Sequence, residues 1–139
     1  MEDAGRASKG PEVRVVCAWH EALNGGDADR LVALSHPDVE VGGPRGKGSG
    51  AHLMRDWVNR AGVTMEPLRV YHRAATVVVE QAVQWRSDGS GEVIGGQTVA
   101  SVFVVRDGLV ASVARYDDLA GALDTIGLDH SDEARSEHG

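Results

Sequence analysis

The stretch ALNGGDADRLVAL, residues 22–34, holds the end of one helix, a Gly-Gly turn and the start of a second helix. Gly25 and Gly26 end the first helix, because glycine readily adopts the left-handed conformation found at helix ends. Asp27 then offers a carboxylate to the free amide groups of the next helix. The stretch therefore predicts a helical hairpin that folds over another part of the molecule.

Helical patterns flank this hairpin on both sides. Apolar residues between positions 12 and 24 recur every three or four places, which predicts one amphipathic helix. After the hairpin, residues 39–41 predict a short strand that leads into the glycine-rich loop GGPRGKGSG, and residues 51–61 predict a third helix.

Beyond Gly62 the apolar period changes to two, which is typical of strands. The pattern and the turn signals SDGSG and RDG predict strands over residues 67–73, 76–86, 93–106 and 109–117. A closing helix follows over residues 119–126, with Asp118 and Gly127 as its caps. Helices followed by hairpin-connected strands predict an α+β fold: a curved antiparallel sheet wrapped around three N-terminal helices, with a short C-terminal helix.

The length of 139 residues fits one domain. We expect this domain to span residues 11–130. Residues 1–10 and 131–139 are polar without apolar periodicity and are predicted to be disordered tails.

The composition argues against several classes of partner. A formal net charge of −7 disfavours binding to nucleic acid and to anionic membranes. The chain shows neither a signal peptide nor an apolar run of about 18 residues, and a single cysteine, Cys17, excludes a disulfide framework. We therefore expect a soluble cytoplasmic protein.

Three motifs, in this order, resemble the nuclear transport factor 2-like superfamily, which includes SnoaL-type polyketide cyclases, ketosteroid isomerase and limonene epoxide hydrolase. They are ALNGGDADRLVAL, PDVEVGGPRGKGSG and FVVRDGLVASVARYDDLAGALDTIGL, and the resemblance covers residues 13–128. It implies a cystatin-like α+β roll, with a cone-shaped, curved antiparallel or mixed sheet around three N-terminal helices, in which the helical hairpin closes the mouth of the cone.

Two of these families are similar in fold but not in catalytic residues. By similarity to ketosteroid isomerase, Trp19 stands at the position of the oxyanion-binding Tyr, Gly43 at that of the general base, and Ser101 is the nearest match to the neutral carboxylic acid. By similarity to limonene epoxide hydrolase, Gln81, Val83 and Arg115 occupy the positions of the Asp-Arg-Asp relay. Neither type of chemistry is expected here.

SnoaL-type cyclases are similar in a different way, because they pair a His with an Asp for acid-base work. In this sequence either Asp117 or Asp118 stands where the Asp is expected, although Asp118 is more simply a helix cap. Either His72 or His20 could supply the His, and no motif decides between them.

The predicted strands bring several polar groups to one face. Alternation places Arg115 and Asp117 on the same side of the last strand, and Gln81 and Trp85 on one side of an earlier strand. We predict Asp117 and Arg115 as catalytic residues, the carboxylate acting as a base and the guanidinium polarising the substrate. The alternative is a structural ion pair between Arg115 and Asp117.

An apolar binding site is predicted beside this pair. The residues predicted to contact substrate are Trp19, Trp57, Tyr71, Gln81, Trp85, Ser101 and Phe103. Core packing is the alternative role for each aromatic residue. The histidines show neither HxxxH nor HxH spacing, so we expect no metal, and no cofactor motif is present.

Two function classes follow. The first is a pocket for a small hydrophobic, polyketide- or terpenoid-like molecule, with cofactor-independent cyclase, isomerase or hydratase activity. The second is a non-catalytic ligand-binding or dimerisation module. A homodimer through the sheet is expected, because strands such as residues 76–86 and 93–106 carry apolar side chains on both faces.

Overall fold

A computed structural model describes residues 11–43, 46–50, 52, 55, 63–86, 92–129 and 132–133. Within these residues one six-stranded sheet has the strand order β2-β1-β6-β5-β4-β3. Strands β1 and β6 pair in parallel and every other pair is antiparallel, so the sheet is mixed. The strands are β1 (Ser35–Gly43), β2 (Gly46–Ser49), β3 (Val63–Arg73), β4 (Thr76–Arg86), β5 (Val93–Arg106) and β6 (Leu109–Tyr116).

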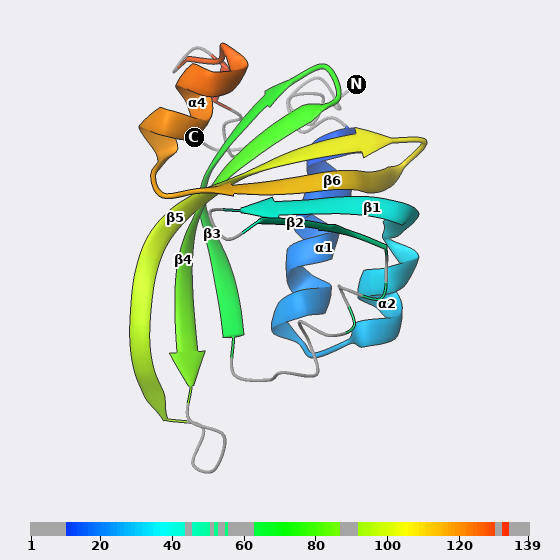
Figure 1. Ribbon diagram of the computed structural model, residues 1–139, viewed down its shortest axis with the longest axis vertical. Helices are drawn as coiled ribbons and strands as arrows, with labels where there is room; N and C mark the ends of the chain where they lie inside the picture. The colour runs from blue at the N-terminus through cyan, green and yellow to red at the C-terminus, as the bar shows by residue number, and fades with distance from the viewer. Residues whose placement is uncertain are drawn as a thin grey trace, which may run out of the picture.

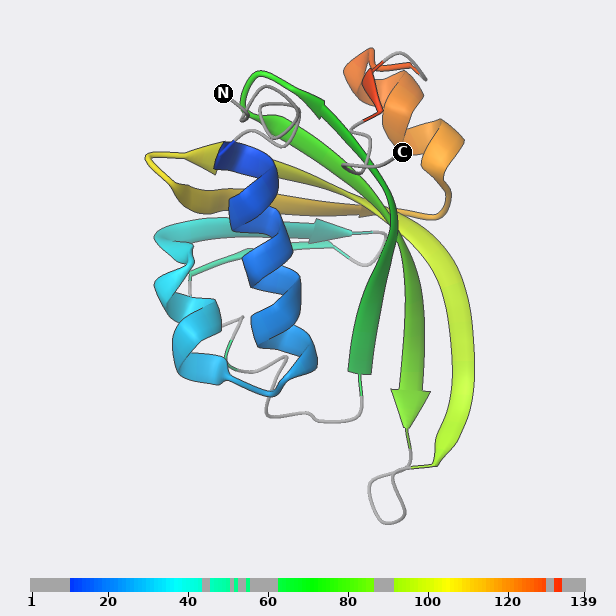
Figure 2. The ribbon, with the colours of Figure 1, turned by 180° about the vertical axis from the view of Figure 1, so that it is seen from behind.

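Helices cover both faces of this strongly curved sheet (Figure 1). Helices α1 (Pro11–Asn24) and α2 (Ala28–Ala33) lie on one face, seen in front of the strands in Figure 2. Helix α4 (Leu119–Ile126) covers part of the other face. We call these the inner face, under α1, and the outer face, under α4. Along β4, Val77 and Val79 belong to the inner core and Val78 to the outer core, as strand alternation requires.

The helical hairpin forms as predicted. The Asp27 carboxylate accepts a hydrogen bond from the Arg30 backbone N–H at 3.1 Å, and Gly26 has a φ of 72°. Asn24 fixes the hairpin to β3 by donating to the Met65 carbonyl at 2.9 Å and accepting from the Met65 N–H at 2.8 Å. The turn therefore holds α1 against the inner face.

The second half of the chain also follows the prediction closely. The bounds of β4, β5 and α4 are those expected from the sequence, while β6 ends one residue earlier than expected and β3 begins at Val63 rather than Pro67. The Asp118 carboxylate caps α4 by accepting from the Gly121 N–H at 2.7 Å, and Gly127 ends the helix with a φ of 76°.

Two expectations for the first half need correction. Strand β1 is longer than predicted, and β2 lies within the stretch predicted to be a loop, paired with β1. Glycine-rich strands lack the apolar alternation that reveals a strand in a sequence. The prediction of three N-terminal helices is not met in the described part of the chain, which holds α1 and α2; of residues 51–61 only His52 and Arg55 are described, and both are helical.

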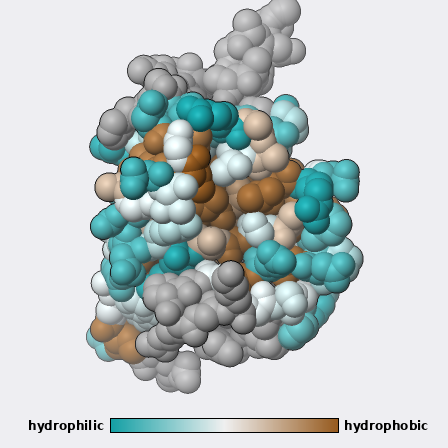
Figure 3. Space-filling view, turned by 45° about the horizontal axis from the view of Figure 1, so that its top comes forward, coloured by the Kyte–Doolittle hydropathy of each residue, from teal (hydrophilic) through white to brown (hydrophobic). Residues whose placement is uncertain are grey.

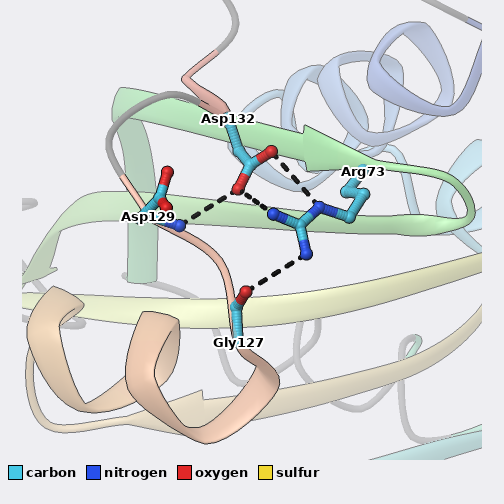
Figure 4. A network of polar contacts seen from close by, with 4 residues as sticks. All are labelled: Arg73, Gly127, Asp129 and Asp132. Atoms are coloured by element: carbon cyan, nitrogen blue, oxygen red, sulfur yellow. Dashed lines mark hydrogen bonds and ion pairs between the residues drawn. The ribbon is translucent and has the colours of Figure 1, made fainter.

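The chain beyond α4 is tied to the end of β3 by a polar cluster (Figure 4). Arg73 Nη2 and Nε contact the two carboxylate oxygens of Asp132 at 2.7 and 3.3 Å, and Arg73 Nη1 donates to the Gly127 carbonyl at 3.2 Å. The Asp129 N–H donates to Asp132 at 3.0 Å. This cluster holds Leu128 in the outer core, next to Tyr71.

The surface is mixed in character. In the view of Figure 3 hydrophobic residues gather toward the middle of the face and hydrophilic ones surround them. Strongly exposed large apolar side chains among the described residues are Leu68, Val93 and Ile94. None of the described helices is long and apolar enough to cross a membrane.

Candidate functional site

A chain of hydrogen-bonded polar side chains crosses the inner core. His20 of α1 and Gln81 of β4 meet through their Nε2 atoms, which are 2.8 Å apart. Ser101 of β5 donates from its hydroxyl to Gln81 Oε1 at 2.8 Å. All three side chains are buried, with residue exposures of 2%, 0% and 3%. Buried polar groups of this kind are tolerated only when they are hydrogen-bonded to one another.

The ring of His20 is neutral. Its Nδ1 lies 2.8 Å from the Val16 carbonyl oxygen, which can only accept, so Nδ1 carries the proton. Burial lowers the pKa of His20 to about 4, against the raising effect of the Val16 carbonyl. Nε2 is therefore an acceptor and receives its hydrogen bond from the Gln81 amide group.

Aromatic rings enclose the helix end of this polar chain. Trp19 packs edge-on against Phe103 with ring centroids 5.0 Å apart, and against His20 at 5.3 Å. Phe103 and His20 are 5.4 Å apart. Trp19 and Phe103 are both fully buried. The predicted residues Trp19, Gln81, Ser101 and Phe103 are thus brought together on the inner side of the sheet.

Arg115 lies beside this group. In the antiparallel pairing of β5 and β6 it stands directly opposite Ser101. It shares the inner side with Val113, two positions earlier on β6. Its Nε atom is buried from solvent and has no hydrogen-bond partner within the described residues. An unsatisfied buried guanidinium N–H is a costly group, and it suits an acceptor atom brought by another molecule.

Asp117 lies at the surface. It follows the last residue of β6, in the bend before α4, and it is exposed. Within the part of the chain that the structure describes, no ion pair joins it to Arg115, so the structural ion pair considered as an alternative does not form. Asp118 has the separate task of capping α4.

The other predicted binding residues lie apart from this group. Trp85 is half-buried near the end of β4, opposite Gly95 of β5 and on the same side of the sheet as Gln81. A side chain at position 95 would meet the Trp85 ring, with only 3.3 Å to Cε3. Glycine there leaves room for the indole. Trp57 lies outside the described residues.

Tyr71 lies on the other face. It belongs to the outer core with Val78, because the pairing of β3 with β4 shifts between Pro67 and Arg69 and reverses the alternation beyond that point. Tyr71 also raises the pKa of the neighbouring Arg69. The structure therefore does not bring Tyr71 together with Trp19 and Gln81.

The two histidines considered for acid-base work are both engaged elsewhere. Each ring nitrogen of His20 holds a hydrogen bond inside the core. His72 stands near the β3–β4 turn, where its Nε2 lies 2.8 Å from the Ala74 carbonyl and 3.2 Å from a carboxylate oxygen of Glu12. The sequence did not reveal the contact of His20 with Gln81, because it joins residues 61 positions apart.

Residues 16–113 match the family model described as SnoaL-like domain. Among curated proteins none matches in sequence.

Solved structures share the fold. TerC, crystallised with polyporic acid, aligns with a TM-score of 0.66 at 18% identity over 84% of this chain and 98% of its own. A proposed polyketide cyclase from Xanthomonas campestris pv. campestris aligns with a TM-score of 0.65 at 21% identity, over 86% of this chain and 98% of its own. A protein of ketosteroid isomerase-like fold from Catenulispora acidiphila, in complex with trimethylamine, aligns with a TM-score of 0.63 at 21% identity, over 83% of this chain and 93% of its own. At these identities the similarity shows a common fold.

Proposed function

Because this chain belongs to the SnoaL-like domain family, we propose that it binds a small apolar molecule at the inner face of the sheet, with Arg115 holding an acceptor oxygen of that molecule. The buried Nε of Arg115 carries this proposal. A ligand oxygen would pair this N–H, and an N–H bonded to an ionised or carbonyl oxygen gains most where water is excluded.

The surroundings of Arg115 suit an apolar ligand. Val113 and Phe103 lie on the same side of the sheet and are buried, and the Trp85 indole stands half-buried further along that side. Small-molecule sites in proteins are mostly apolar with a few placed polar groups. Structures of similar fold crystallised with polyporic acid and trimethylamine support small-molecule binding, and the proposed polyketide cyclase supports a polyketide- or terpenoid-like ligand.

A cofactor-independent cyclase, isomerase or hydratase is the second proposal. It rests on Asp117, an exposed carboxylate with no ion-pair partner among the described residues, two positions after Arg115. We do not assign His20 to this chemistry, because both of its ring nitrogens are engaged in hydrogen bonds inside the core. Asp117 would act as base, and Arg115 would stabilise the developing negative charge.

Mass spectrometry of the purified protein under native conditions tests the binding proposal. Wild type should retain a co-purifying apolar compound, and Arg115→Met should lose it. Arg106→Met, an exposed site on β5, is the matched control and should retain it. Retention by Arg115→Met would contradict the role of Arg115. Once the compound is identified, loss of turnover in Asp117→Asn with binding intact would separate the enzyme from the binding module.

A homodimer through the outer face is a separate proposal. Helix α4 covers Val78 and Val102 there, while Ala114 and Tyr116 stay only partly buried at the edge of that core. A second copy of the chain would cover the exposed parts of Ala114 and Tyr116. Multi-angle light scattering should give twice the chain mass for wild type and a smaller mass for Tyr116→Glu; a monomeric wild type would contradict this interface.

A further inference from the structure

The buried hydrogen bonds that link Ser101, Gln81, His20 and the Val16 carbonyl all have the same donor-to-acceptor direction. Val16 offers only a carbonyl oxygen, so His20 must donate from Nδ1 and accept at Nε2. The Gln81 amide nitrogen is then the donor to His20, which turns its carbonyl oxygen toward Ser101. The Ser101 hydroxyl proton is thereby committed to Gln81.

This direction decides what Ser101 can still do. A serine hydroxyl has one proton and two lone pairs. Because Ser101 uses its proton in the hydrogen bond to Gln81, it can only accept a hydrogen bond from a ligand. Turning that proton toward a ligand would leave the fully buried Gln81 oxygen unpaired, which is costly. Arg115 is the opposite case, because a guanidinium can only donate.

The acceptor and the donor are neighbours. Ser101 and Arg115 are directly opposed across β5 and β6. Opposed side chains in an antiparallel pair have Cβ atoms about 5 Å apart. The Ser101 hydroxyl and the Arg115 guanidinium therefore come from neighbouring positions on the same side of the sheet.

We propose that Ser101 and Arg115 together select a ligand that carries a hydroxyl group next to a carbonyl or carboxylate oxygen, with the ligand hydroxyl donating to Ser101 and its oxygen accepting from Arg115. The specificity is imposed from a distance by His20 and Gln81, which fix the direction of the Ser101 proton. This inference rests on the proposed binding function and adds the hydrogen-bonding pattern of the ligand.

Three neutral probes of nearly the same size test it by isothermal titration calorimetry. Benzoin has two phenyl rings and a hydroxyl beside a ketone; benzoin methyl ether keeps the ketone and loses the donor; deoxybenzoin lacks the hydroxyl altogether. Loss of one hydrogen bond should weaken binding about three- to tenfold. Wild type should therefore bind benzoin about three- to tenfold more tightly than either analogue.

Variants assign the discrimination to Ser101. Ser101→Ala should bind benzoin and its methyl ether alike, and Ser101→Thr, which keeps a hydroxyl, should restore the preference. Thermal unfolding by circular dichroism confirms that each variant is folded. Arg115→Met should weaken binding of all three probes.

The outcomes separate this inference from the proposed function. Equal affinity of wild type for the three probes, with weaker binding by Arg115→Met, would overturn the role of Ser101 and leave the binding site standing. A preference for benzoin that survives Ser101→Ala would also overturn it. Failure of wild type to bind any of the probes would overturn both.

Discussion

His20 and Gln81 lie 61 positions apart in the chain, and their Nε2 atoms are 2.8 Å apart in its interior. One comes from the helix that covers the inner face and the other from the sheet itself. Their contact fixes where α1 sits on the sheet and also the direction of the hydrogen bond that reaches Ser101.

Replacing Gln81 by leucine should destabilise the fold. The change leaves His20 Nε2 and the Ser101 hydroxyl buried without partners, and each such group costs about 1–3 kcal/mol. The free energy of unfolding in urea should therefore fall by at least about 2 kcal/mol. Gln84→Leu, at an exposed position of the same strand, is the control and should change little. Equal losses of unfolding free energy in the two variants would contradict the structural role of the His20–Gln81–Ser101 hydrogen bonds.

Stability should depend on pH through His20. Its pKa is about 4 in the folded protein against the ordinary histidine value of 6.5, so the unfolded chain takes up the proton first as pH falls. The stability that depends on a neutral His20 is fully present above pH 6.5 and is lost as the pH falls to about 4. The loss of unfolding free energy over this range should be roughly 3 kcal/mol. The free energy of unfolding in urea, measured at several pH values in this range, should change less steeply with pH in His20→Gln than in wild type. His52→Gln, at an exposed position, should keep the wild-type slope.

The two neighbouring aspartates should respond differently to mutation. Asp118→Ala removes the carboxylate that caps α4 and should cost about 0.5–2 kcal/mol. Asp117→Ala removes an exposed carboxylate that has no cap to supply, so its unfolding free energy should stay within about 0.5 kcal/mol of wild type. Thermal unfolding measures both. A larger loss for Asp117 would show that it has a structural task.

The Arg73–Asp132 ion pair should hold the chain beyond α4 with modest strength. The Arg73 side chain is 54% exposed and that of Asp132 14%, so a coupling of about 0.5–1 kcal/mol is expected from a double-mutant cycle. Hydrogen exchange at Leu128 should speed up in Asp132→Ala, while exchange at Phe103 in the inner core should not change. Unchanged exchange at Leu128 would show that the cluster does not retain this segment.

The sequence predicted those parts of the fold that depend on local signals. Strands β4 and β5 show a clear period of two, and Asp118 and Gly127 bracket α4 with typical caps. Strand β2 was missed because its residues, GKGS, carry no apolar alternation and owe their conformation to pairing with β1.

The candidate site was predicted less completely, for a similar reason. Alternation along single strands placed Gln81, Trp85 and Arg115 on the inner face. The position of Tyr71 depends on the irregular pairing between Pro67 and Arg69, which no residue pattern announces. The partnership of His20 with Gln81 depends on how α1 docks, and only tertiary structure reveals it.

A crystal structure of the protein with benzoin bound shows whether Ser101 and Arg115 form the ligand site. We expect the ligand on the inner face of the sheet, with its ketone oxygen within hydrogen-bonding distance of Arg115 Nε and its hydroxyl next to Ser101 Oγ. A ligand bound elsewhere, or Arg115 Nε paired with a group of the protein while the ligand lies nearby, would contradict it.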